Sequence, residues 1–175
     1  MKHVMIDIET MGSQSQSAIV SIGAVRFDLK TGEIGERFYV NVDLQSCIDA
    51  GLIINSDTLM WWLNQNEEAR KKITEKGFHL NNALVTLSGF ITKDDEVWGN
   101  SARFDLGILS DAYNAVKLPI PWDFRKERCV RTLVAFAPEV KAAEVNTGVA
   151  HDALADCIFQ ISYCSKTYNK LKYGN

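Results

Sequence analysis

The stretch MKHVMIDIETMG, residues 1–12, places two acidic side chains inside a run of strand-forming apolar residues. Residues two apart in a strand project from the same face, so Asp7 and Glu9 point together while Ile6 and Ile8 point into the opposite layer. The apolar run predicts burial on both faces, and a carboxylate buried there is costly unless a partner compensates its charge. The alternative is an edge strand with one solvated face. In a buried strand, the acid pair indicates a functional site.

The composition is that of one globular domain spanning residues 1–175, with 46% hydrophobic and 23% charged residues. No apolar run approaches the roughly 18 residues of a membrane span, and no secretory signal pattern is visible, so a cytoplasmic location is expected. The four cysteines form no C-x-x-C pair, which favours reduced core residues over zinc ligands. A net charge of −3 argues against dense coating of nucleic acid, but not against an enzyme that grips it through divalent ions.

Hydrophobic patterning predicts nine elements in the order β-β-β-α-α-β-α-β-α. Strands are expected over residues 2–9, 18–28 and 34–43, and the last two should pair as an antiparallel hairpin. The remaining elements are a helix capped by Ser56, a helix over 79–92, a strand over 96–98, a helix over 104–117, a strand passing into a helix over 128–136, and a helix over 152–171. This order predicts an α/β fold whose mixed sheet combines an antiparallel meander with parallel strands and is flanked by helices.

A third acid is expected to approach the Asp7/Glu9 pair from the segment after residues 96–98. Asp105 stands there at the start of a predicted helix, where a carboxylate also stabilises the helix N-terminus, so both a functional and a structural role are open. Carboxylates that converge and repel one another are stabilised by hard divalent cations such as Mg²⁺ or Mn²⁺.

The last helix offers a fourth acid and a histidine. Asp156 lies about 140° around the helix from its apolar stripe, so it is not forced into the core, and His151 precedes the helix on the same side. Asp152 is predicted to be the N-cap or a partner of the helix dipole. His3 and His79 have no carboxylate cluster beside them and are interpreted as structural or surface residues.

These residues resemble the three exonuclease motifs of the DEDDh 3′→5′ exonucleases, in order and separation, over nearly the whole chain. The matching segments are Asp7-Ile8-Glu9-Thr10, Asn100-x-x-x-Phe104-Asp105 and His151-x-x-x-x-Asp156. Residues 58–63, 67–70 and 130–133 are similar to a compact, stand-alone bacterial and phage branch, several members of which act on RNA. The resemblance implies a ribonuclease H-like fold. Met11 is a departure, because many members carry a second threonine there.

The resemblance also implies the chemistry. Asp7, Glu9 and Asp156 would hold one Mg²⁺ or Mn²⁺ ion, Asp7 would bridge to a second ion, and Asp105 would complete that second site through water. His151 would be the general base. The expected activity removes nucleoside monophosphates from the 3′ end of single-stranded or 3′-overhanging nucleic acid, with RNA slightly favoured over DNA. Related small enzymes are often dimers, so the resemblance makes a homodimer the candidate assembly.

The terminal base needs a binding surface, and stacking on an aromatic ring contributes about 1–3 kcal/mol per base. The candidates are Trp61, Trp62 and Phe104, of which Trp61 is the freer tryptophan. Adjacent tryptophans cannot share one face of a helix, so we expect Trp62 in the core with Leu59 and Leu63. Further candidate contacts to the substrate are Thr10, the main chain at Met11 and Gly12, Asn100, and the arginines Arg103, Arg128 and Arg131, whose alternative roles are solvated or structural.

Three other functions compete with the exonuclease. A ribonuclease H-type endonuclease uses similar carboxylates, but the spacing of His151 and Asp156 and the N-x-x-x-F-D motif favour the exonuclease. A catalytically silent nucleic-acid-binding module would be free to lose ligands, yet all five motif residues are present. A haloacid-dehalogenase-type phosphatase fits worse, because its second acid would be Asp in place of Glu9.

Overall fold

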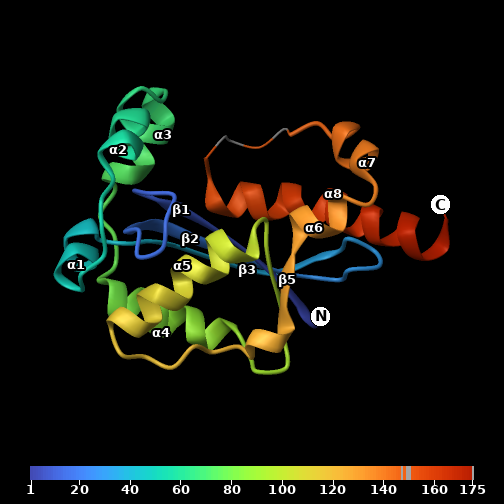
Figure 1. Ribbon diagram of the computed structural model, residues 1–175, viewed down its shortest axis with the longest axis horizontal. Helices are drawn as coiled ribbons and strands as arrows, with labels where there is room; N and C mark the ends of the chain where they lie inside the picture. Colours follow the sequence, from blue (N-terminus) through green and yellow to red (C-terminus); the bar gives the residue numbers. More distant parts are fainter. Residues whose placement is uncertain (147, 149–150, 175) are drawn as a thin grey trace.

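The fold is built on a five-stranded mixed sheet in the order β3-β2-β1-β4-β5, seen in a computed structural model that describes residues 1–146, 148 and 151–174 (Figure 1). The strands are β1 (His3–Thr10), β2 (Ile19–Phe27), β3 (Ile34–Asn41), β4 (Glu96–Gly99) and β5 (Glu127–Cys129). β2 pairs antiparallel with both β1 and β3, whereas β1, β4 and β5 run parallel. The predicted meander, hairpin and mixed sheet are confirmed.

Helices connect and cover these strands. They are α1 (Leu44–Asp49), α2 (Ser56–Leu63), α3 (Glu67–Thr74), α4 (Leu80–Phe90), α5 (Ala102–Ala115), the 3₁₀ helix η1 (Phe124–Lys126), α6 (Val130–Val134), α7 (Pro138–Ala142) and α8 (Ala153–Tyr173). α1, α3 and α7 were not predicted, because five to eight residues carry too little periodicity. The predicted cap at Ser56 is wrong by one residue: the Asn55 side chain accepts from the amides of Asp57 and Thr58.

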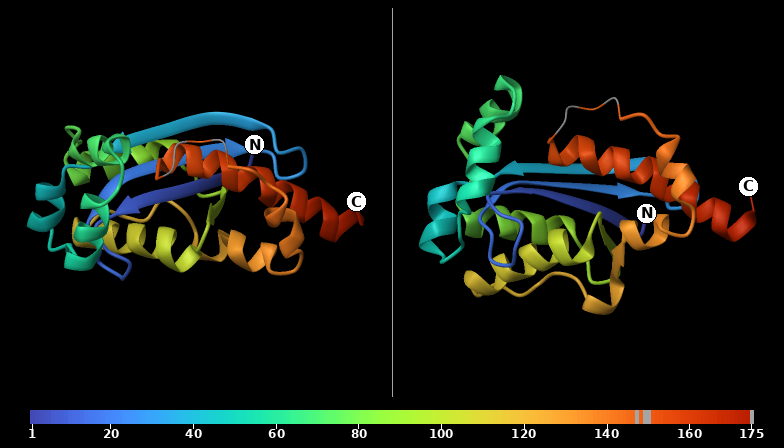
Figure 2. Two further views of the ribbon diagram at one scale, coloured as in Figure 1. Left: turned by 90° about the horizontal axis from the view of Figure 1, so that it is seen from above. Right: turned by 45° about the horizontal axis from the view of Figure 1, so that its top comes forward.

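β1 is buried on both of its faces. Ile6 and Ile8 belong to the core formed with α4 and α5, whereas Met5 packs in the second core, with Cys157 and Ile161 of α8. Figure 2 shows this layering, with α8 on one side of the sheet and α4 and α5 on the other. The edge-strand alternative is therefore wrong, and Asp7 projects from the face that α8 covers.

A glycine allows α8 to start directly on the sheet. Gly23 of β2 pairs with Asp7 of β1, and a Cβ at Gly23 would lie 2.5 Å from the backbone carbonyl of Ala153. No side chain can occupy that position without moving α8. The first turn of α8, which carries Asp156, is thereby held beside the acidic strand.

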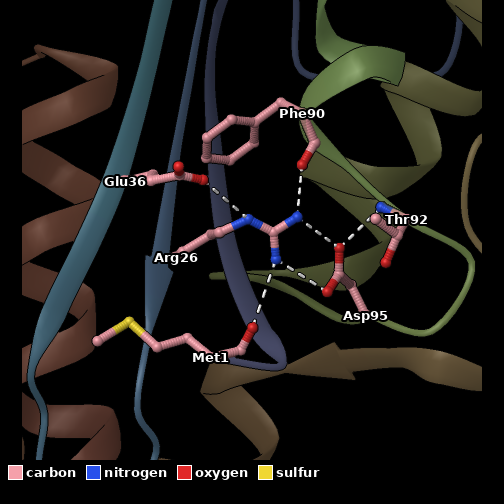
Figure 3. Close-up of polar contacts among 6 residues, drawn as sticks. All are labelled: Met1, Arg26, Glu36, Phe90, Thr92 and Asp95. Carbon is pink, nitrogen blue, oxygen red and sulfur yellow. Dashed lines mark hydrogen bonds and ion pairs between the residues drawn. The ribbon is translucent and has the colours of Figure 1, made fainter.

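A part-buried ion pair fastens the end of the sheet opposite to the acids (Figure 3). Both terminal nitrogens of Arg26 donate to Asp95 at 2.9 Å, and Nη2 also donates to the carbonyl of Phe90 at 2.6 Å. Burial opposes ionisation of Asp95, but the hydrogen bonds from Arg26 and Thr92 outweigh it and lower the pKa of that carboxyl. The contact ties β2 to the turn between α4 and β4.

Two predictions about the core need correction. Trp62 is 1% exposed, as predicted, but Leu59 and Leu63 are 39% and 52% exposed, because α2 and α3 stand beside the sheet and are not laid on it (Figure 1). Three of the four free cysteines are buried, whereas Cys129 is only half-buried at the start of α6. Within the described residues, no helix has both the length and the apolar character needed to cross a bilayer.

Candidate active site

Three of the predicted acids meet at one point. Each of Asp7, Glu9 and Asp156 offers a carboxylate oxygen, and these oxygens all lie within 4.8 Å of one another. Asp7 and Glu9 come from β1, and Asp156 comes from the first turn of α8. Asp7 is buried, while the other two are half-buried. Such a set of hard oxygen donors fits a divalent cation of the Mg²⁺ or Mn²⁺ class.

The electrostatics of Asp7 also fit a cation. Burial, and then the negative charges of Asp105 and Glu9, raise the pKa of Asp7 well above its usual range, and a hydrogen bond from Gln160 opposes this only in part. Without a cation, ionised Asp7 is therefore disfavoured by its own surroundings. A bound positive charge would reverse that preference.

Asp105 approaches the same pair from the neighbouring strand. β1 and β4 are parallel, so the segments that follow them emerge at the same edge of the sheet. Asp105 lies in the first turn of α5, is 2% exposed, and accepts from the Ser101 amide at 3.0 Å. Burial raises the pKa of Asp105 to about 6, against the lowering effect of backbone hydrogen bonds from Ser101 and Ile8. It lies outside the three-carboxylate cluster but acts on it through its charge.

The absence of a side chain at Gly99 leaves space for the Asp105 side chain. A Cβ on Gly99 would stand 2.9 Å from Cβ and 3.0 Å from Oδ2 of Asp105. The glycine at the end of β4 is therefore part of how the fold positions this acid.

Gln160 is a site residue that the sequence analysis missed. It is 4% exposed, and its Nε2 donates to Asp7 Oδ1 at 2.7 Å. The signal was its spacing: Gln160 lies four residues after Asp156, so both occupy one face of α8. An amide side chain on the same helix face as a predicted metal ligand would have indicated a second residue of the site.

A cleft of about 270 Å³ opens above the acids, and we call it the catalytic cleft. It is lined by Asp7, Ile8, Glu9, Thr10, Gly12, Ser13, Thr58, Trp61, Trp62, Phe104 and Asp156. Thr10 connects two other residues of the cleft lining. The Thr10 Oγ1 donates to the Gly12 carbonyl at 2.5 Å, and the Thr10 carbonyl accepts from Trp62 Nε1 at 2.9 Å. Trp61 is 42% exposed at this cleft.

Two predicted substrate residues lie elsewhere. Met11 is 2% exposed, and its amide donates to the Ala18 carbonyl at 2.8 Å, so that amide is already used within the fold. Asn100 lines a separate small hollow with Val130 and Tyr163, and its carbonyl accepts from the Arg131 amide at 3.0 Å. Neither residue lines the cleft, and contacts of these two with substrate stay a prediction.

His151 contacts the two tryptophans of the cleft lining and is not a member of the three-carboxylate cluster. Its ring packs edge-on against Trp61, with 4.8 Å between centroids, and lies 6.0 Å from the ring of Trp62. Its backbone adopts a left-handed conformation, with φ of 60°, immediately before α8. Asp152 then caps the helix, as predicted: Oδ1 accepts from the Ala155 amide at 2.7 Å.

Known proteins share both the sequence pattern and the fold. A model of the 3′-5′ exoribonuclease Rv2179c-like domain matches residues 2–168. The chain belongs to this family. An exodeoxyribonuclease of Enterobacteria phage T4 is 27% identical over 191 residues, covering 87% of this chain and 83% of the phage protein.

Solved structures of exonucleases superpose on the family member described here. E. coli exonuclease I in complex with a dA16 oligonucleotide has a TM-score of 0.70 at 17% identity, covering 98% of this chain. The chain spans only 41% of the length of that exonuclease I. The nuclease domain of 3′hExo, a DEDDh family member bound to rAMP, has a TM-score of 0.62 at 12% identity, covering 96% of this chain and 92% of that domain.

The Rv2179c-like chain is thus a 3′→5′ exonuclease with the DEDDh, ribonuclease H-like fold that its motifs predicted. Asp7 and Glu9 lie toward the carboxyl end of β1, and Asp105 lies in the first turn of α5, the helix that follows β4.

Proposed function

We propose that this exonuclease removes nucleoside 5′-monophosphates one at a time from the 3′ end of single-stranded or 3′-overhanging nucleic acid, with RNA slightly favoured over DNA. Residues 1–175 would act as one exonuclease domain. The observation that carries the proposal is the cluster of Asp7, Glu9 and Asp156, whose oxygens lie within 4.8 Å of one another beside the cleft.

Asp7, Glu9 and Asp156 would hold one Mg²⁺ or Mn²⁺ ion, and Asp7 with Asp105 would hold a second. Bound there, such ions activate a water and stabilise the leaving 3′ oxygen. The fold brings the acids together in a partly buried site, where their mutual repulsion favours binding of a cation. The raised pKa of Asp7 reflects this burial and repulsion.

His151 would accept the proton of the attacking water, because an imidazole can do so near neutral pH. Its ring packs edge-on against Trp61, and Trp61 lines the catalytic cleft.

The terminal nucleoside would occupy the catalytic cleft, with Trp61 and Phe104 as stacking surfaces and Thr10 and Gly12 on the wall.

The comparisons point both ways on the preferred sugar: the family description names an exoribonuclease, whereas the phage T4 relative is an exodeoxyribonuclease. A homodimer is part of the proposal, and light scattering at micromolar concentration would report it.

The experiment uses 5′-labelled RNA and DNA of one sequence, incubated with Mn²⁺ or with EDTA. We expect a ladder that shortens by one nucleotide from the 3′ end in Mn²⁺ alone, and faster for RNA. Internal cuts would replace the proposal with the endonuclease alternative. Intact oligonucleotides in Mn²⁺ would contradict it, and faster DNA decay would overturn the sugar preference.

A further inference from the structure

We infer that a second hollow beside the catalytic cleft binds the sugar–phosphate backbone on the 5′ side of the scissile phosphate. This upstream hollow measures about 870 Å³ and lies between the loop after β1, the first turns of α5 and the start of α6. The inference rests on the proposed function, because it takes the terminal nucleotide to sit in the catalytic cleft.

The two hollows adjoin each other. Ser13 and Phe104 line both of them. Phe104 immediately precedes the buried acid Asp105, so its ring stands at the border between them. A strand whose last nucleotide occupies the catalytic cleft can therefore continue past Phe104 into the upstream hollow. At about 870 Å³ against about 270 Å³, the upstream hollow has room for more of the strand than the cleft has.

The charge of the upstream hollow suits phosphates. Arg103 and Arg131 both line it, and both are exposed side chains. Guanidinium groups bind phosphate oxygens through short, charge-assisted hydrogen bonds. The third arginine considered from the sequence, Arg128, forms an ion pair with Glu96 and donates to the Arg125 carbonyl, so its charge is used within the fold.

The remaining polar groups favour contacts to the backbone over base reading. The one carboxylate of the lining, Asp111, is eight residues beyond Arg103, or about 12 Å along the helix axis. The Asp111 Oδ2 atom accepts a hydrogen bond from the Gln16 amide at 3.0 Å. This bond connects the loop after β1 to α5 on one side of the hollow. Four serines, Ser101 and Ser110 among them, and the amide side chain of Gln14 are the other polar groups of the lining. Hydroxyl and guanidinium contacts to sugar and phosphate carry no sequence information, so the hollow would serve strands of any sequence.

The test compares substrates with and without upstream phosphates. In the dinucleotide UpU the only phosphate is the scissile one, whereas the hexanucleotide of the same base has four more on its 5′ side; the deoxy counterparts are used if DNA is the faster substrate. The variants are Arg103→Gln, Arg131→Gln and the double variant. Arg125→Gln is the matched control, because Arg125 is an exposed arginine outside both hollows.

We expect the double variant to raise KM for the hexanucleotide about tenfold, and to change kcat/KM for UpU much less, through the charge that Arg131 exerts on Asp105. The salt dependence of log kcat/KM for the hexanucleotide should become shallower by about 1.4, or about 0.7 for each phosphate that an arginine no longer neutralises. The double variant behaving like Arg125→Gln on the hexanucleotide would overturn the inference while the activity stands. A wild-type chain that cleaves neither substrate in Mn²⁺ would overturn the proposed function, and the inference with it.

Discussion

Gln160 Nε2 donates a hydrogen bond of 2.7 Å to Asp7 Oδ1, across 153 positions of sequence, and the two residues are only 4% and 9% exposed. The bond restrains the orientation of the Asp7 carboxylate beside the other acids. Partners of this kind orient metal ligands and tune their affinity. Gln160 is thus a positioning residue for the proposed metal site.

Replacing Gln160 by Leu should weaken Mn²⁺ binding. Leucine fills a similar volume in the helix packing but lacks the hydrogen-bond donor to Asp7. Losing such a partner typically lowers metal affinity by about 10- to 100-fold. Isothermal titration of Mn²⁺ into the protein without nucleic acid measures this directly. Thr167→Val is the control, since Thr167 is a buried polar residue of the same helix with 0% exposure. Equal Mn²⁺ affinity in Gln160→Leu and in the control would refute the positioning role.

The two acids at the start of α8 should behave oppositely. Asp156→Ala removes a proposed metal ligand and should abolish turnover with the fold retained. Asp152→Ala removes the N-cap acceptor of the Ala155 amide, so it should cost about 1 kcal/mol of stability and leave kcat nearly unchanged. Turnover on a 5′-labelled oligonucleotide and thermal unfolding separate the two effects. Wild-type activity in Asp156→Ala would show the metal assignment to be wrong.

Adding one methyl group at Gly99 should impair catalysis although no carboxylate is replaced. The new Cβ would press on Cβ and Oδ2 of Asp105, at 2.9 and 3.0 Å, and move that acid. A displacement of about 1 Å in an active site can cost about 100-fold in rate, so we expect a loss in kcat of about 10- to 100-fold. Gly89→Ala in α4 is the matched control, because its Cβ would meet nothing within 4 Å. Full activity in Gly99→Ala would mean that the position of Asp105 is not critical.

The metal-free protein should lose stability as the pH rises, because of Asp7. Its pKa in the folded chain is raised above that of the unfolded chain, so the folded state binds more protons between those two values. Stability present at lower pH is therefore lost as the pH rises through that window. Asp7→Asn removes this loss and, in EDTA, should unfold at a higher temperature than wild type at pH 7.5, by about 2–4 °C for each kcal/mol recovered. The difference should shrink at pH 4.

Thermal unfolding in EDTA at the two pH values measures this, and Mn²⁺ provides the internal check. Mn²⁺ should stabilise wild type and have little effect on Asp7→Asn, because binding to the folded state raises its stability. A wild-type chain that is the more stable of the two at pH 7.5 in EDTA would contradict the account of Asp7.

The sequence was sufficient where a local pattern carried the information. The apolar run around Asp7 and Glu9 predicted a strand buried on both faces, and the 3.6-residue period of the last helix separated Asp156 from the apolar stripe. The sequence was insufficient where packing between distant elements determined which residues are exposed or in contact. Leu59 follows a helical stripe, yet it is exposed because α2 stands off the sheet, and the partnership of Gln160 with Asp7 joins two elements whose contact no local pattern encodes.

The most direct test of the central claim, that Asp7, Glu9 and Asp156 form the divalent-metal site of this exonuclease, is an anomalous difference map from crystals soaked in Mn²⁺ with a nucleoside 5′-monophosphate. We predict one Mn²⁺ peak among these three carboxylates and a second, about 4 Å away, on the side of Asp105. Mn²⁺ peaks only at other positions, in crystals of an active enzyme, would contradict the account.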